Sequence, residues 1–190
     1  MSIEKSRNIT RFIVRAGIFS AMAAILYIAG SFIPLYLFSD FLQIHIDEIP
    51  AFIASFAYGP FMGIVVLVIK TLLKLPFTKT LCIGELADLL YSIAFVIPAA
   101  IIYKRNRKFK SAIIGFVVGF VIQIVVSFFF NIFVMIPFYG MLYELPQAFL
   151  DGKWAFAATA ILPFNVIKNL IVIAITLPTY KTLHRLIDKI

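Results

Sequence analysis

Long, uncharged apolar runs recur along this chain, and they constrain its fold more than any other feature. The run from Ile113 to Phe130 has no charged residue and is apolar at both odd and even positions. In a bilayer, backbone groups must be satisfied without water, so only helices and closed barrels span it. A barrel needs segments that alternate apolar and polar residues. The run instead predicts helices, and the chain is expected to be an all-α membrane protein.

Length and composition set the number of spans. The chain has 190 residues, of which 63% are hydrophobic and 14% charged, too few charges to cover a soluble domain. Since a span needs about 20 apolar residues, roughly five or six spans fit. We therefore expect a single integral membrane domain over residues 1–190, with no soluble catalytic domain. The first apolar stretch exceeds signal-peptide length and lacks a small-residue cleavage site, so the first helix is expected to stay.

Proline, glycine and charged residues divide the chain into six expected spans. Their approximate ranges are 11–33, 47–58, 61–73, 84–103, 111–135 and 157–180. The second and third spans are also compatible with one broken hairpin. The loop 35–46 mixes apolar and polar residues, which suits either a lid over a ligand or an ordinary surface loop. A long connection is expected over 138–154.

Charged residues separate between the two sides of this six-span arrangement. Both termini share a side with the basic segment from Lys104 to Lys110. The positive-inside rule makes that side cytoplasmic in a cell membrane. The other side receives seven of the nine acidic residues: Asp40, Asp47, Glu48, Glu85, Asp88, Glu144 and Asp151. The net charge of +8 is therefore a topology signal, and nucleic-acid binding is not expected.

Three polar residues interrupt otherwise apolar spans, and all fall in the expected outer half of the membrane. They are Asn131, Asn165 and Lys168. Asn165 and Lys168 are three residues apart, so they share one helix face. Polar groups inside a membrane are costly and usually face the bundle interior. Together their amides and ammonium could hold a neutral, hydrogen-bond-rich solute. The alternative is that each asparagine joins helices and Lys168 extends toward the interface.

Two acidic residues, Glu85 and Asp88, begin the fourth span three positions apart. Lys70 and Lys74, late in the third span, could neutralise them. Either acid could instead cap the helix.

Small residues recur at four-residue spacing in the first span, at Ala16, Ser20 and Ala24, and again at Gly17 and Ala21. Such spacing lets another helix approach closely. The partner is either a helix of this chain or a separate membrane protein.

Catalytic and metal signatures are missing from the sequence. It contains no Walker, HExxH or GxSxG motif. The single cysteine, Cys82, excludes an intrachain disulfide and a multi-cysteine metal site. We expect no metal and no cofactor. A membrane enzyme would have to use the remaining acidic cluster: Asp47, Glu48, Glu85 and Asp88.

Five short motifs follow one another along essentially the whole chain. They are Asp47-Glu-Ile-Pro50, Tyr58-Gly-Pro60 running to Lys70, Gly84-Glu-Leu-Ala-Asp88, Asn131 before Pro137, and Ile161-Leu-Pro-Phe-Asn165-Val-Ile-Lys168. The ordered set resembles the riboflavin-binding S-components of energy-coupling factor (ECF) transporters. Asp88 departs from this pattern, since many relatives are expected to have asparagine there. S-components for pantothenate and other vitamins share the fold, so they remain an alternative.

The resemblance implies a six-helix S-component bundle with a vitamin pocket on the outer side, covered by the first loop as an extracellular lid. It implies that Asn131, Asn165 and Lys168 contact the flavin, which is a transported ligand and not a cofactor. Further expected ligand-binding residues are Asp40, Leu42, Asp47, Glu85 and Asp88. Expected partners are membrane lipid, a transmembrane coupling subunit and two ATPases. The stripe of Ala16, Ser20 and Ala24 is the expected docking face for the coupling subunit.

Overall fold

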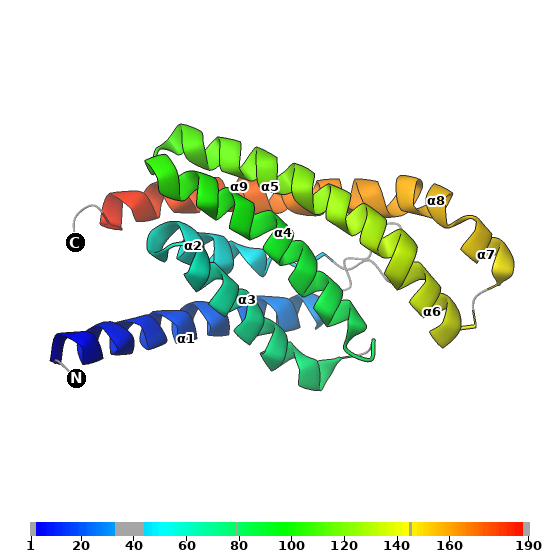
Figure 1. The fold of residues 1–190 in the computed structure, drawn as a ribbon, viewed down its shortest axis with the longest axis horizontal. Helices are drawn as coiled ribbons and strands as arrows, with labels where there is room; N and C mark the ends of the chain where they lie inside the picture. Colours follow the sequence, from blue (N-terminus) through cyan, green and yellow to red (C-terminus); the bar gives the residue numbers. More distant parts are fainter. Residues whose placement is uncertain (1–2, 33–43, 79, 145, 188–190) are drawn as a thin grey trace.

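The protein folds as a bundle of helices, with no strand in the residues that the structure describes (Figure 1). The structure is a computed structural model that describes residues 3–32, 44–78, 80–144 and 146–187. Its helices are α1 Ile3–Phe32, α2 Glu48–Tyr58, α3 Pro60–Lys74, α4 Ile83–Asn106, α5 Phe109–Phe130, α6 Ile136–Leu142, α7 Gln147–Asp151, α8 Lys153–Phe156 and α9 Leu162–Ile187. The all-α prediction is confirmed. Most of the expected lid loop, including Asp40 and Leu42, lies outside the described residues.

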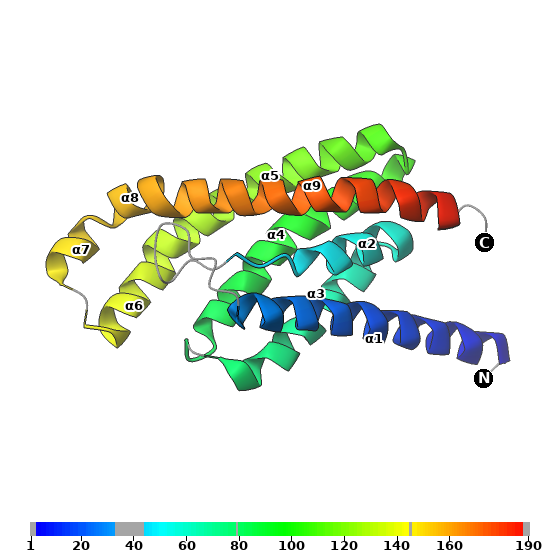
Figure 2. The same cartoon turned by 180° about the vertical axis from the view of Figure 1, so that it is seen from behind.

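In the part of the chain that the structure describes, five helical segments are long and apolar enough to cross a membrane. They are Glu4–Gly30, Pro60–Phe77, Ile83–Asn106, Phe109–Leu142 and Lys153–Thr179. The second expected span, α2, has only 11 residues, or about 16 Å of helix against about 30 Å of hydrocarbon. It forms a hairpin with α3 and lies between α1 and α9 (Figure 2).

Gly59 makes the tight turn of this hairpin possible. Its φ of 100° lies in a region that side-chain-bearing residues avoid. Its N–H donates to the Ser55 carbonyl at 2.8 Å, which ends α2. Pro60 then starts α3, where a missing N–H costs nothing. The Tyr58-Gly59-Pro60 signal in the sequence therefore marks a real helix boundary.

The fifth predicted span does not stop before Pro137. A π-helical turn over Asn131–Met135 joins α5 directly to α6, and the helix continues to Leu142. Proline lacks an N–H and crowds the preceding turn, and a wide π turn just before it relieves both problems. The expected long connection is accordingly mostly helical, comprising α6, α7 and α8.

Both termini lie at one end of the bundle (Figures 1 and 2). The turn between α4 and α5, which carries the basic segment, lies at the same end. The α3–α4 and α6–α7 connections lie at the opposite end. The fold thus gathers the basic segments on one side, as the six-span arrangement predicts.

Many large apolar side chains are exposed on the spanning helices, as expected of a lipid-facing surface. Ile13, Phe61 and Val117 are 62%, 67% and 57% exposed. Inside, Phe52 packs against Phe95 and Phe116 with ring centroids 4.8 Å apart in each case. This aromatic core ties α2 to α4 and α5.

Helices α4 and α5 approach each other closely at Gly115. A Cβ there would lie 2.7 Å from the Ala99 carbonyl oxygen, too close for any side chain. Dispersion contacts of this kind drive helix association in lipid, where no hydrophobic effect operates between helices.

Candidate functional site

Lys70, on α3, lies at the centre of a buried polar cluster. Its ammonium pairs with Asp47 at the start of α2 and with Asp88 Oδ2 on α4, the latter at 3.0 Å. It also donates to Ser92 Oγ at 3.3 Å. Lys70 and Asp47 are both fully buried, so this lysine is the counterion that lets two carboxylates lie inside the bundle.

Lys168, on α9, occupies the other side of the same cluster. Its ammonium lies 2.6 Å from Glu48 Oε1 and 3.3 Å from Asp88 Oδ1. Ser92 Oγ, which accepts from Lys70, reaches Glu48 Oε1 at 3.4 Å. The contacts therefore close a ring that joins α2, α3, α4 and α9.

The ring carries a formal charge of −1, because three carboxylates face two ammonium groups. Among the described residues, Asp47 Oδ1 and Glu48 Oε2 are buried without a hydrogen-bond partner. A buried acceptor without a partner costs about 1–3 kcal/mol, and more when charged. The cluster is therefore suited to a ligand that brings hydrogen-bond donors and no negative charge. Across the described ranges, no group of three or more His, Cys, Asp or Glu residues could hold a metal ion.

A second buried network surrounds Asn165. Gln123 Nε2, on α5, donates to Asn165 Oδ1 at 2.7 Å, and Asn169 Nδ2 donates to Gln123 Oε1 at 2.6 Å. Asn165 Nδ2 donates to the Ile161 carbonyl at 2.9 Å. The sequence interpretation missed Gln123 and Asn169. The signal was available, because Gln123 is a strong hydrogen-bonding residue inside an uncharged apolar run.

Asn131 lies on the π turn, apart from both networks. Its Nδ2 donates to Tyr91 Oη at 2.9 Å and to the Ser127 carbonyl at 2.7 Å. In the described part of the chain, no hydrogen bond joins Asn131, Asn165 and Lys168 to one another. The structure therefore brings these three onto neighbouring helices but gives each its own partners.

Glu85 is held by threonines and not by a lysine. Its Oε2 accepts from the Thr78 and Thr80 hydroxyls, each at 2.8 Å. The same hydroxyls accept the backbone N–H groups of Cys82 and Gly84 at 3.1 Å, so they cap α4 in place of the two acids. Of the expected neutralising contacts, the one between Lys70 and Asp88 forms.

The small-residue stripe of α1 is internal, which favours a partner helix of this chain over a separate membrane protein. Ala16, Ser20 and Ala24 are 4%, 1% and 4% exposed, and α1 packs on α3 and α2. The chain's own helices therefore cover this close-approach face. Gly17 and Ala21 lie on the exposed side of the same helix.

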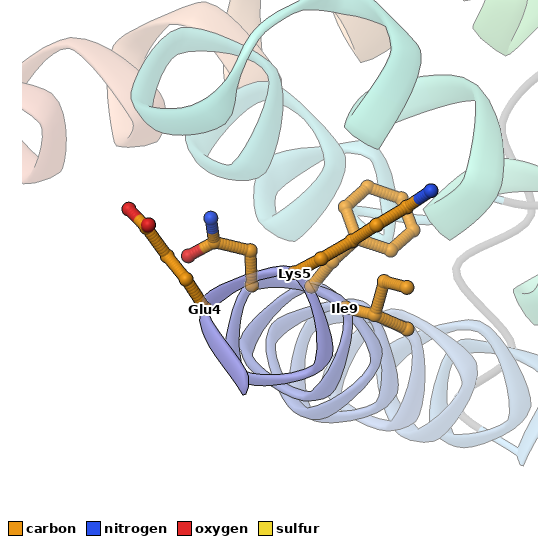
Figure 3. A pocket seen from close by; sticks show the side chains of 5 residues that line it. Glu4, Lys5 and Ile9 are labelled. Carbon is orange, nitrogen blue, oxygen red and sulfur yellow. The ribbon is translucent and has the colours of Figure 1, made fainter. Parts of the chain in front are cut away.

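A surface hollow lies at the start of α1 (Figure 3). Its lining consists of Glu4, Lys5, Asn8, Ile9 and Phe12. None of the predicted ligand-binding residues contributes to it. The hollow belongs to the end of the bundle that holds the termini.

Comparison with known proteins identifies similar chains. Residues 11–180 match the family described as "ECF transporter, substrate-specific component". The riboflavin transporter RibU of Staphylococcus aureus (strain TCH60) is 33% identical over 159 residues, which cover 84% of this chain and 81% of that protein. The riboflavin transporter FmnP of Bacillus subtilis (strain 168) is 28% identical over 137 residues, covering 70% and 72%.

A solved structure has a similar fold. It is described as the S component of a bacterial ECF transporter, and it superimposes with a TM-score of 0.75 at 27% identity. The match covers 93% of this chain and 97% of the other.

Proposed function

The chain belongs to the family of ECF transporter substrate-specific components, and from that premise we propose that it is the riboflavin-binding subunit of a vitamin uptake system. The family consists of transporter components and not of enzymes. The two named relatives, both riboflavin transporters, support this choice of vitamin.

The single observation that carries the proposal is the set of hydrogen-bonding groups left over on Lys168, Asn165 and Asn131. Lys168 directs two of its three N–H groups to carboxylates. Asn165 uses one amide N–H within the protein, and Asn131 uses both of its own. Within the described contacts, two donors and one amide carbonyl therefore remain for a ligand.

These leftover groups complement the pyrimidine edge of a flavin. That edge presents a carbonyl, an N–H and a second carbonyl in a row. Lys168 and Asn165 would donate to the two carbonyls, and Asn131 Oδ1 would accept from the N–H. Tyr91, which already bonds Asn131, would supply aromatic surface to the ring system.

The acidic residues would complete the site. The unpartnered oxygens of Asp47 and Glu48 would accept from the hydroxyls of the ribityl chain, and Asp88 would hold Lys168. Glu85, Asp40 and Leu42 remain proposed ligand neighbours at the outer end. A neutral polyol fits this site better than an anionic vitamin such as pantothenate, because the ring already carries a negative charge.

Capture would take place on the outer side, with both termini in the cytoplasm. Release would require a separate transmembrane coupling subunit and two ATPases, since the sequence has no nucleotide-binding motif of its own. The burial of Ala16, Ser20 and Ala24 supports a coupling interface formed by other residues of the chain.

Titration of purified protein with riboflavin tests the proposal. We expect saturable quenching of flavin fluorescence, and chromatography of the released ligand should return unchanged riboflavin. Unchanged ligand also separates a binding subunit from a membrane enzyme. Absence of quenching together with saturable binding of pantothenate would overturn the choice of vitamin and leave the family assignment intact.

A further inference from the structure

Lys70 is not among the predicted ligand-binding residues, yet it contacts more residues of the polar ring than any other member does. It contacts Asp47, Asp88 and Ser92 and is completely buried. Lys70 is linked to Lys168 through Asp88, because the two lysines form ion pairs with different oxygens of the Asp88 carboxylate. We propose that Lys70 is a positioning residue, which sets the place of the Lys168 ammonium for the ligand without touching the ligand itself.

The geometry gives the mechanism. Asp88 Oδ2 is bound to Lys70 at 3.0 Å, so Oδ1 is left for Lys168 at the longer distance of 3.3 Å. The Lys168 ammonium therefore makes its closer ion pair with Glu48 Oε1, at 2.6 Å. Without Lys70, both oxygens of Asp88 would be free to attract Lys168, and the ammonium would shift from α2 toward α4. A displaced ammonium would no longer match the flavin carbonyl.

Ring closure through Ser92 couples the two lysines a second time. Ser92 Oγ lies 3.3 Å from Lys70 Nζ and 3.4 Å from Glu48 Oε1. Lys70 thus influences both carboxylates that hold Lys168. Stability alone does not account for such a ring, because apolar side chains of similar volume often stabilise a protein as well as a buried ion pair does.

A double-mutant cycle between Lys70 and Lys168 tests this role, which rests on the proposed function. Lys168→Met should weaken riboflavin binding by about 10- to 100-fold, the loss of one charged hydrogen bond. Lys70→Met should weaken it by about 10-fold or more. If Lys70 acts through Lys168, the double variant should bind no more weakly than Lys168→Met alone. Losses that multiply would overturn the proposal, as would wild-type affinity in Lys70→Met.

Lys74 provides the matched control. It lies one turn further along α3 and is also buried. Its ammonium lies 5.2 Å from the centroid of the Tyr27 ring and that of Lys70 lies 4.9 Å from the same centroid, so the control matches this ring contact. Among the ion pairs of the described residues, none joins Lys74 to Asp88 or Lys168. Lys74→Met and Lys168→Met should therefore have effects that multiply. If Lys70→Met fails to fold, a variant that combines Lys70→Met with Asp47→Asn replaces it in the cycle. This variant restores the formal charge of −1 on the ring.

A labelling measurement that needs no ligand tests the positioning role of Lys70 separately from the proposed riboflavin-binding function. Acylation of lysines in the unliganded protein, followed by mass spectrometry, reports the accessibility of Lys168, which is 5% exposed. Lys70→Met should raise labelling of Lys168 several-fold, and Lys74→Met should leave it unchanged. Unchanged labelling in Lys70→Met would refute the positioning role. Failure of the wild type to bind flavin would refute the proposed function alone, and the labelling result would then decide the role of Lys70.

Discussion

Leucine substitutions on α1 would separate internal packing from docking. Ala16 and Ala24 are each 4% exposed, and Ala16 belongs to the main apolar core. Gly17 and Ala21 lie on the other side of the same helix, and a Cβ at Gly17 would meet no atom within 4 Å. The pair Ala16→Leu with Ala24→Leu is therefore the perturbation, and Gly17→Leu with Ala21→Leu is its matched control.

The expected magnitude follows from overpacking. Extra methylene groups in a filled core cost about 1–3 kcal/mol at each site. The two positions are eight residues, or about 12 Å, apart along the helix, so their effects should add. The pair should lose about 2–6 kcal/mol, a large part of the roughly 5–15 kcal/mol that holds an ordinary domain together. The exposed control pair should stay within about 0.5 kcal/mol per site.

Three measurements on the same two variants decide the matter. They are thermal unfolding in detergent, riboflavin binding by the purified protein, and riboflavin uptake by cells. Internal packing predicts that Ala16→Leu with Ala24→Leu loses all three together, while the control pair keeps its folding and its binding. A well-folded Ala16→Leu, Ala24→Leu protein that binds flavin but does not support uptake would refute this reasoning and restore the stripe as a docking face.

Three further predictions concern other parts of the bundle. Ser20→Ala should raise the free energy of unfolding by about 1 kcal/mol, because the buried Ser20 hydroxyl has no partner among the described residues; a lower melting temperature would contradict this. Gln123→Leu should weaken riboflavin binding about 10-fold, since it strips the two asparagine amides of their shared partner; unchanged affinity would show that the network is not part of the site. In intact cells of a variant lacking Cys82, an impermeant thiol reagent should label Glu144→Cys and not Arg107→Cys, and the reverse pattern would invert the topology.

The tight fit of α4 against α5 illustrates what pattern alone does not reveal. Gly115 is one of two glycines in the apolar helix α5, and the sequence does not distinguish it from Gly17 of α1. In the fold, a Cβ at Gly115 would meet the Ala99 carbonyl oxygen at 2.7 Å, whereas one at Gly17 would meet nothing within 4 Å. The difference arises from the neighbouring helix and not from the glycine itself.

The sequence by itself determined the class of the protein and its main boundaries. Uncharged apolar runs leave only helices as spanning elements, the Tyr58-Gly59-Pro60 turn separates α2 from α3, and basic segments collect at the end that carries the termini. It also picked out the polar positions Asn131, Asn165 and Lys168, because polar groups in apolar spans are costly and rarely incidental. These features depend on local composition and on the thickness of a bilayer, so they need no knowledge of which helix neighbours which.

Only the tertiary structure decided which faces of the helices meet. A helix that is apolar all round carries no periodic signal for its buried side, so the stripe at Ala16 suited an internal and an external partner equally well. The sequence also does not predict which buried charges pair. Lys168 and Asp88 are 80 positions apart in the chain, and their contact depends on how α9 and α4 are rotated about their axes. Partner choice among buried charges depends on distances of a few ångströms, and the packing of α2, α3, α4 and α9 sets those distances.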